Sequence, residues 1–254
     1  MGYLHEGHLS LIRQSKKKCD TTIVSIFVNP TQFGPSEDFK NYPRNFEKDS
    51  QMLEEEGVDF LFLPSTEEIY SKNFQTYINV EHITKNLEGE FRPTHFRGVT
   101  TVVMILLNCV QPDFTFFGQK DAQQLAVIKQ MVNDLKLNVQ IISCPIVRET
   151  DGLAMSSRNF YLSDSERKDA LVLFNSLQSA KKIVDSGEIR VGIILSEIEG
   201  IFSNIDSANL DYVKIVEADT FEIVDELVNG KEYFVLVACK IGKTRLIDNL
   251  IFTA

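Results

Sequence analysis

The chain has 254 residues, of which 43% are hydrophobic and 24% are charged. These values are ordinary for globular proteins and exclude wholesale disorder, and the length suits one large domain or two smaller ones. The formal net charge of −10 disfavours binding to nucleic acid and to anionic membrane, so any anionic substrate requires a local positive site.

Three further features favour a cytoplasmic protein. The longest strictly apolar run, residues 102–107, is far shorter than the ~20 residues that span a bilayer. The first eight residues lack the apolar core and cleavage site of a secretion signal. The four cysteines are widely spaced without a C-x-x-C pair, which is typical of reduced, mostly buried thiols.

The first part of the chain alternates predicted strands with predicted helices. Runs rich in β-branched and aromatic residues predict strands over residues 21–28, 58–63, 113–117 and 138–143. Apolar periodicity and helix-ending residues predict helices over residues 45–56, 98–110 and 122–135. Continuous apolar strands separated by helices indicate an α/β fold with a parallel sheet covered on both faces.

The pattern changes after Pro145. A capping box at 163–166 predicts a helix to residue 186, and a second helix is predicted over 191–203. Strands then follow one another without helices, over residues 212–217, 233–241 and 244–248, the last two joined by a tight turn at Gly242. We therefore expect a domain of residues 1–146 and a smaller α+β domain of residues 147–254.

The segment His5-Glu-Gly-His8 is the first with catalytic potential. If a helix begins around Gly7, His8 lies in its first turn and His5 just ahead of it. A helix start offers free backbone N–H groups and partial positive charge that bind phosphate, and bound phosphate favours protonated imidazole. The alternatives are two solvent-facing histidines or a zinc pair, although H-x-x-H lacks the i, i+4 spacing of H-E-x-x-H.

Two more polar segments follow predicted strands. Gln32 lies where open α/β sheets place ligands, and its amide can both donate and accept; a loop without function is the alternative. Lys120 suits a phosphate, with an ordinary surface lysine as the alternative, and Gln124 lies one helical turn further on roughly the same face. Asp121 stands where a helix cap is expected, whatever else it does.

Residues 147–158 lie at the predicted domain boundary. Within them, residues 156–158 supply two hydroxyls and a guanidinium, which can bind an anion or form loop and helix caps. Residues 92–97 and 42–44 also carry arginines, and surface ion pairing is the alternative there. The segments together predict an enzyme that acts on a phosphate compound.

These segments closely resemble the pantoate–β-alanine ligase family. The matching strings are M-G-Y-L-H-E-G-H at 1–8, F-V-N-P-T-Q-F-G at 27–34, Y-P-R at 42–44, R-P-T-H-F-R-G-V at 92–99, F-F-G-Q-K-D-A-Q-Q at 116–124 and V-R-E-T-D-G-L-A-M-S-S-R-N at 147–159. Their order and spacing agree with the family, and the resemblance is strongest up to about residue 162.

The resemblance implies a nucleotidyltransferase-type Rossmann fold in residues 1–146 and a smaller lid domain in residues 147–254. It implies that pantoate attacks the α-phosphate of Mg·ATP, giving pantoyl adenylate and pyrophosphate. The amine of β-alanine then displaces AMP and forms pantothenate, a step of the coenzyme A pathway. The resemblance also implies a homodimer.

The resemblance further implies roles for individual residues. The implied catalytic residues, which would stabilise charge on the phosphates, are His5, His8, Lys120 and Arg158. His8 matches the family's proton donor, Gln32 and Gln124 match the glutamines that bind pantoate, and Gln32 also matches a β-alanine contact. The implied ATP site consists of Met1, Gly2, Tyr3, Leu4, His5, Glu6, Gly7, His8, Gly118, Gln119, Lys120, Asp121, Val147, Met155, Ser156, Ser157 and Arg158. The metal ligands stay open, with Glu37, Asp38 and Asp49 as candidates.

The chain departs from the family pattern in two ways. Gln119 stands where the family usually has glutamate, and we expect little effect. The family also has a first strand and a Pro-Thr pair ahead of the position of Met1. We therefore expect Met1 to be an internal methionine of a longer chain. For this chain we predict either an unpaired gap in the sheet or a substitute strand from elsewhere.

Two other functions stay open. One is another adenylyl- or cytidylyltransferase with an H-x-G-H element, acting on phosphopantetheine or a nicotinate nucleotide. The other is a non-catalytic nucleotide-binding module, which would bind ATP without turnover.

Overall fold

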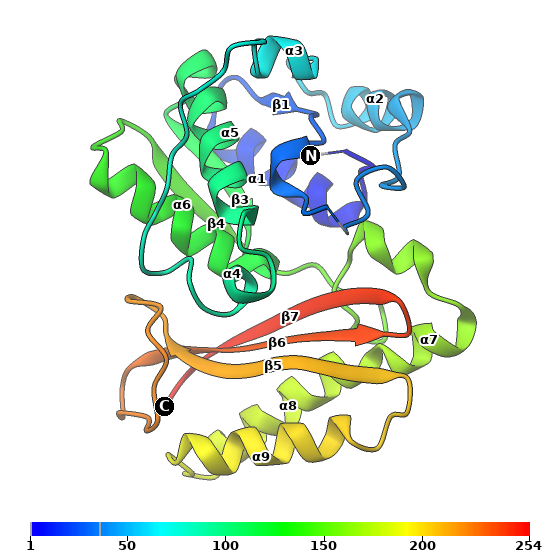
Figure 1. Cartoon of the computed structure of the whole chain (residues 1–254), viewed down its shortest axis with the longest axis vertical. Helices are drawn as coiled ribbons and strands as arrows, with labels where there is room; N and C mark the ends of the chain where they lie inside the picture. Colours follow the sequence, from blue (N-terminus) through cyan, green and yellow to red (C-terminus); the bar gives the residue numbers. More distant parts are fainter. Residues whose placement is uncertain (1, 36) are drawn as a thin grey trace. The chain divides into compact units, whose positions relative to one another are not determined.

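The computed structural model describes residues 2–35 and 37–254, which fall into two units, Met1–Pro145 and Ile146–Ala254 (Figure 1). The elements of the first unit are α1 (Glu6–Lys18), β1 (Ile23–Ser25), η1 (Pro30–Gln32), α2 (Phe46–Glu55), β2 (Phe60–Phe62), α3 (Thr66–Ile69), α4 (Glu88–Phe91), α5 (His95–Val110), β3 (Phe114–Gly118), η2 (Gln119–Asp121), α6 (Ala122–Asp134) and β4 (Gln140–Cys144). Each strand and helix predicted for this unit is found, although β1 and β2 are shorter than predicted.

The parallel sheet of the first unit consists of two separate pairs of strands. In one pair β1 runs parallel to β2, with Ile23 opposite Phe60, and in the other β3 runs parallel to β4, with Phe114 opposite Gln140. Among the described residues no strand joins the two pairs. An unpaired gap of this kind is one of the two outcomes expected from the sequence.

Helix α1 packs against both pairs of strands. Its Leu9 and Ile12 belong to a buried cluster with Leu4 and with Val24 of β1, and the helix also contacts β3 and β4. Burying a side chain such as Ile12 contributes on the order of 1.5–3 kcal/mol. The packing therefore fixes the start of α1, which carries the two histidines, beside the strands.

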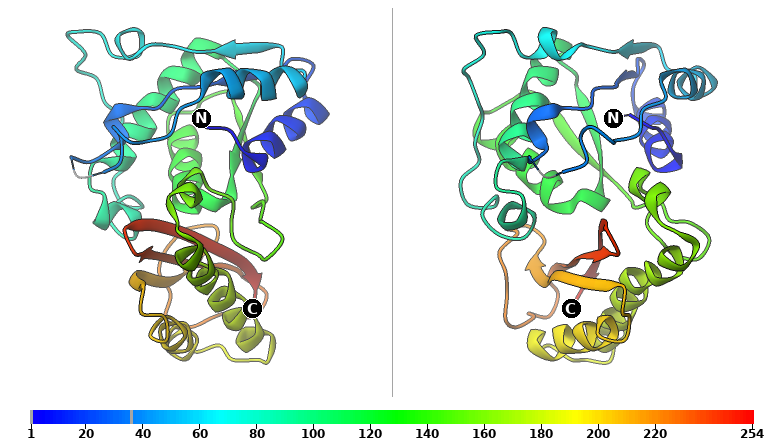
Figure 2. Two further views of the ribbon diagram at one scale, coloured as in Figure 1. Left: turned by 90° about the vertical axis from the view of Figure 1, so that its right-hand side faces the viewer. Right: turned by 45° about the vertical axis from the view of Figure 1, so that its right-hand side comes forward.

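The second unit contains a three-stranded antiparallel sheet and two long helices (Figure 2). Its elements are η3 (Ser157–Tyr161), α7 (Asp164–Asp169), α8 (Leu171–Asp185), α9 (Val191–Phe202), β5 (Ala208–Glu217), β6 (Glu232–Ile241) and β7 (Thr244–Thr253). The predicted turn is found between β6 and β7, where Gly242 has φ 57° and Ile241 pairs with Thr244. The single long helix predicted from residue 163 is wrong, because Ala170, with ψ −19°, separates α7 from α8.

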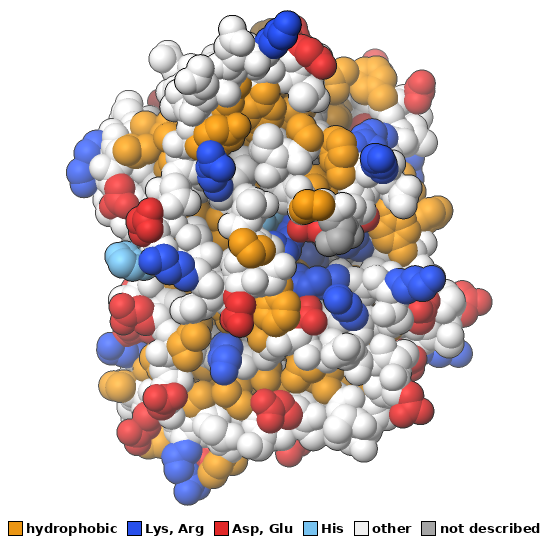
Figure 3. Space-filling model, viewed as in Figure 1, with side chains coloured by type: hydrophobic (Ala, Val, Ile, Leu, Met, Phe, Trp, Pro, Cys, Tyr) orange, Lys and Arg blue, Asp and Glu red, His pale blue; other side chains and the backbone are white. Residues whose placement is uncertain are grey.

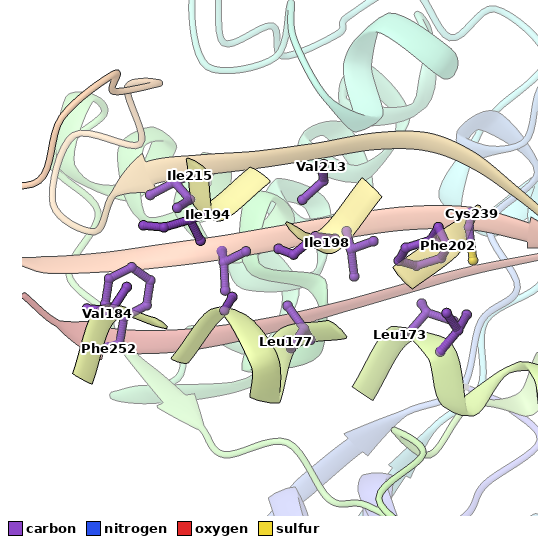
Figure 4. Close-up of a cluster of buried hydrophobic side chains, with 14 of the residues drawn as sticks. Leu173, Leu177, Val184, Ile194, Ile198, Phe202, Val213, Ile215, Cys239 and Phe252 are labelled. Atoms are coloured by element: carbon purple, nitrogen blue, oxygen red, sulfur yellow. The ribbon is translucent and has the colours of Figure 1, made fainter. Parts of the chain in front are cut away.

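The core of the second unit lies between α8, α9 and one face of the sheet (Figure 4). Leu173 and Leu177 are one helical turn apart in α8, as are Ile194 and Ile198 in α9, so each helix presents an apolar stripe. These side chains pack with Ile215 of β5. Throughout residues 2–35 and 37–254, no helix has both the length and the apolar character that crossing a membrane requires.

Candidate active site

The two histidines of the first motif form the start of α1. His5 is the N-cap residue, and its Nδ1 accepts a hydrogen bond from the N–H of Gly7 at 3.2 Å. In return, the N–H of His5 donates to Nδ1 of His8 at 3.4 Å. The two ring centroids are 4.1 Å apart. The predicted placement of both histidines is therefore confirmed.

This reciprocal capping fixes the tautomer of both rings. A backbone N–H can only donate, so Nδ1 is the acceptor in each histidine and the proton of the neutral ring lies on Nε2. Burial lowers the pKa of His8 well below 6.5, and nearby positive charge, including that of Lys120, lowers it further. His8 is therefore a neutral ring whose Nε2–H can donate to an anion.

The expectation of free N–H groups at the helix start is wrong at two positions. The N–H of Gly7 is bound to His5 Nδ1, and the N–H of His8 donates to the backbone oxygen of His5 at 2.7 Å. A histidine N-cap supplies these acceptors itself, which the sequence interpretation did not consider. Imidazole N–H groups are thus the stronger candidates for contacting a phosphate here.

Gln32 ends the short helix η1 after β1, and its side chain is oriented by Asn29. Asn29 is 1% exposed, and its Oδ1 accepts hydrogen bonds from the N–H of Thr31 at 3.3 Å and the hydroxyl of Tyr70 at 2.8 Å. Its Nδ2 therefore donates, to the backbone oxygen of Gly98 at 3.1 Å and to Oε1 of Gln32 at 3.4 Å. With the oxygen of Gln32 turned to Asn29, its NH₂ group is the end available to a ligand.

The backbone of Gln32 is held by a second network. Nδ1 of His95 donates to the backbone oxygen of Gln32 at 2.9 Å, and Nε2 of His95 is 3.2 Å from Nη1 of Arg92. Arg92 also pairs with Glu37 at 2.7 Å. Burial, followed by the charge of Arg92, lowers the pKa of His95 to about 4. The sequence left residues 92–97 undecided, and these contacts place Arg92 and His95 in support of Gln32.

Lys120 lies in η2, between β3 and the start of α6, and its positive charge contributes to the lowered pKa of His8. Gln124 is half-buried in the first turn of α6. The adjacent Gln123 has a structural role, because it accepts from the N–H of Glu88 and donates to two backbone oxygens. Asp121 occupies the N-cap position of α6, as expected, although its side chain makes no cap hydrogen bond.

The candidate metal ligands do not form a metal site. Both oxygens of Asp49 accept backbone N–H groups, and Glu37 is paired with Arg92. Within residues 2–35 and 37–254, no group of three or more His, Cys, Asp or Glu side chains could hold a metal ion. The described residues thus do not fit a magnesium ion held by the protein alone.

The last candidate segment lies in the second unit. Met155 donates its N–H to the backbone oxygen of Val147 at 3.0 Å, so these two predicted ATP contacts are neighbours. Ser156 caps η3, its Oγ accepting the N–H of Arg158 at 3.2 Å, which favours the capping alternative for that hydroxyl. Arg148 connects the segment to β7 through a bidentate ion pair with Asp248, in which Nη1 and Nη2 donate to the two carboxylate oxygens at 2.6 and 3.0 Å.

The family model described as pantoate–β-alanine ligase matches residues 1–251. The chain belongs to the pantoate–β-alanine ligase family. It is 54% identical to a pantothenate synthetase of Caldicellulosiruptor bescii, over 100% of this chain and 89% of the relative. It is 55% identical to that of Acetivibrio thermocellus, over 99% of this chain and 89% of the relative.

Solved structures of the family share the fold. A pantothenate synthetase from Thermus thermophilus matches with a TM-score of 0.94 and 43% identity, over 98% of this chain and 90% of that one. A pantoate–β-alanine ligase from Francisella tularensis matches with a TM-score of 0.80 and 36% identity, over 99% and 87%. That structure is described as complexed with βγ-ATP and β-alanine. The resemblance drawn from the motifs and the predicted α/β fold class are therefore confirmed.

Proposed function

We propose that this chain joins pantoate to β-alanine with ATP, giving pantothenate, AMP and pyrophosphate. A carboxylate oxygen of pantoate attacks the α-phosphorus of ATP, and the bond to the leaving pyrophosphate breaks. The amine of β-alanine then attacks the acyl carbon of the adenylate, AMP leaves, and the amine loses a proton. The observation that carries this proposal is the pair of capped histidines beside the charge of Lys120, in a chain whose family match spans residues 1–251.

The phosphates are the proposed ligands of His5, His8 and Lys120. Two Nε2–H donors and one ammonium group supply hydrogen bonds and positive charge where negative charge develops on the leaving pyrophosphate. A local cluster of this kind is needed, since the net charge is −10 and acidic, basic and apolar side chains are mixed on the face in Figure 3. Mg²⁺ enters with ATP, held mainly by phosphate oxygens and water.

The acid substrates are the proposed ligands of Gln32 and Gln124. The NH₂ group of Gln32 is turned away from Asn29, so it favours an acceptor such as a carboxylate or hydroxyl oxygen. Pantoate carries both groups, and β-alanine carries a carboxylate. Gln32 therefore suits a contact to each of them in turn.

The remaining parts of the proposal rest on the resemblance. Residues 1–146 would bind the nucleotide and pantoate, and residues 147–254 would act as a lid that keeps water from the adenylate. The lid would contribute Val147, Met155, Ser156, Ser157 and Arg158 to the ATP site, with Gly2–His8 and Gly118–Asp121 on the other domain. Met1, also assigned to ATP, lies outside the described residues. A homodimer in the cytoplasm completes the proposal.

The test is exchange of labelled pyrophosphate into ATP by the purified chain with Mg²⁺. Exchange that requires pantoate supports adenylate formation on that acid. Exchange with phosphopantetheine or a nicotinate nucleotide, and none with pantoate, would assign the chain to another transferase reaction. ATP binding without exchange on any acceptor would leave a nucleotide-binding module.

A further inference from the structure

We propose that Asp49 is a positioning residue that fixes the phosphate-binding histidines through the backbone ahead of them; the inference rests on the proposed function. Asp49 lies in α2 and is 2% exposed. Its Oδ2 accepts the N–H of Tyr3 at 2.8 Å, and its Oδ1 accepts the N–H of Leu4 at 2.6 Å. These two amides directly precede the N-cap residue His5.

The carboxylate is the one side-chain group that suits this position. A buried carboxylate is unfavourable unless hydrogen bonds replace its lost water, and two charge-assisted bonds do so here. Each N–H needs an acceptor, and Asp49 offers one oxygen to each of them. Asparagine would turn its NH₂ group towards one of the two amides, so it cannot satisfy both.

The bonds to Asp49 hold a backbone path that is unfavourable by itself. Tyr3 has φ 52°, in the left-handed region of backbone conformations that residues other than glycine rarely adopt. The chain then enters His5 in an extended conformation, with φ −145° and ψ 173°. In that conformation the N–H of His5 meets Nδ1 of His8, the contact that leaves the proton of His8 on Nε2. Asp49 therefore positions the ring of His8 through the backbone of Tyr3, Leu4 and His5.

Packing and an ion pair fix the position of helix α2, which carries Asp49. Leu53 of α2 and Leu4 lie in the same buried cluster. At the other end of the helix, Arg13 of α1 pairs with Glu56, with Nε at 3.0 and 3.1 Å from the two carboxylate oxygens. These contacts hold α2 against Leu4 and against α1, and so they set the position of Asp49 ahead of His5.

The test compares Asp49→Asn with two controls. Glu47→Gln removes an exposed carboxylate from the same first turn of α2. Met131→Ala opens a cavity at a fully buried residue of α6 and so lowers stability without touching the loop. The measurements are the Kd of the α,β-methylene analogue of ATP with Mg²⁺ by calorimetry, the melting temperature, and the ring ¹⁵N shifts of His8.

We expect Asp49→Asn to raise the Kd of the ATP analogue by about tenfold, because the binding free energy of about one hydrogen bond to the phosphates is lost. Its His8 ¹⁵N shifts should report a mixture of both tautomers, while both controls keep the wild-type Kd and the Nε2–H tautomer. A lower melting temperature with unchanged Kd and tautomer would overturn the inference and leave Asp49 a stabilising residue only. Failure of the wild-type chain to bind the analogue would instead overturn the proposed function, because it does not involve Asp49.

Discussion

Nδ1 of His95 donates a hydrogen bond to the backbone oxygen of Gln32, 2.9 Å away. On the other side of the ring, Nε2 accepts a hydrogen bond from Nη1 of Arg92 at 3.2 Å. A second ring proton would bring an N–H against the guanidinium group, so the buried ring stays neutral. A histidine that carries no charge thereby anchors the residue proposed to bind pantoate.

This geometry predicts a pH dependence of stability. The pKa of His95 is about 4 in the folded chain against 6.5 without the fold, because of burial and the charge of Arg92. Between these values the unfolded chain binds more protons, so the free energy of unfolding rises with pH. The contribution is fully present above pH 6.5 and lost as the pH falls towards 4, about 3 kcal/mol in all.

Urea denaturation of the wild-type chain and of His95→Gln from pH 4 to pH 7 measures this contribution. The free energy of unfolding of the variant should fall less steeply with falling pH than that of the wild type. The lowered pKa of His8 has an effect in the same direction, but it is present in both chains, so the difference between the two slopes reports His95 alone. His82→Gln, at an exposed histidine, should keep the wild-type slope. Equal slopes for His95→Gln and wild type would mean that the ring is not held neutral.

Lys120→Ala should lower pantoate-dependent pyrophosphate release by about 100-fold, as the loss of a preorganised charge at a transition state does. The fold should persist, because Lys120 lies in a partly exposed turn. Lys129→Ala removes an exposed lysine from α6 and should leave the rate unchanged. Wild-type release by Lys120→Ala would refute the assigned role.

Substitutions of Gln32 test which end of its amide contacts the acid. Gln32→Ala should raise the KM for pantoate about tenfold and the KM for ATP much less, since one hydrogen bond to a charged oxygen is lost. Gln32→Glu should be worse than Gln32→Ala, because a second carboxylate would face the substrate. Gln130→Ala, at an exposed glutamine of α6, serves as control. Equal effects on both KM values would mean that the acid pocket is misplaced.

Gly98→Ala should disturb the loop that carries Gln32. A Cβ at Gly98 would lie 2.4 Å from the backbone oxygen of Thr31 and 2.6 Å from the nitrogen of Gln32. Overpacking of this kind destabilises by about 1–3 kcal/mol. Gly200→Ala, in α9 with open space around it, should stabilise by up to about 1 kcal/mol. Urea denaturation and the pantoate KM check both, and unchanged values for Gly98→Ala would show that η1 and α5 need no such close approach.

The strand and helix order of the first unit could be predicted because each element has a local signal of apolar residues and ending residues. The last strand was predicted over residues 244–248 only, and the Asp and Asn at 248 and 249 are residues that disfavour strands. It continues to Thr253, because it pairs with β6 along its whole length, up to Thr253 opposite Glu232, while Arg148, distant in sequence, pairs with the buried Asp248. That contact cannot be inferred from local propensity.

The candidate site shows the same limit. His5 and His8 could be placed from the sequence, because a helix start is a local feature. Asn29 and Asp49 were not assigned their roles, since these depend on Gly98 and Tyr3, which are distant along the chain. The Asn-Pro pair that ends the first strand was the available signal for Asn29, whereas nothing local marks Asp49 as buried.

The most direct test of the proposed two-step ligation follows both half-reactions of the purified 254-residue chain with Mg²⁺ and ATP. Pyrophosphate and AMP are measured with pantoate alone and then after β-alanine is added. We expect pyrophosphate release that requires pantoate, followed by AMP and pantothenate in equal amounts once β-alanine is present. AMP release that ignores β-alanine, or pyrophosphate release that ignores pantoate, would contradict it.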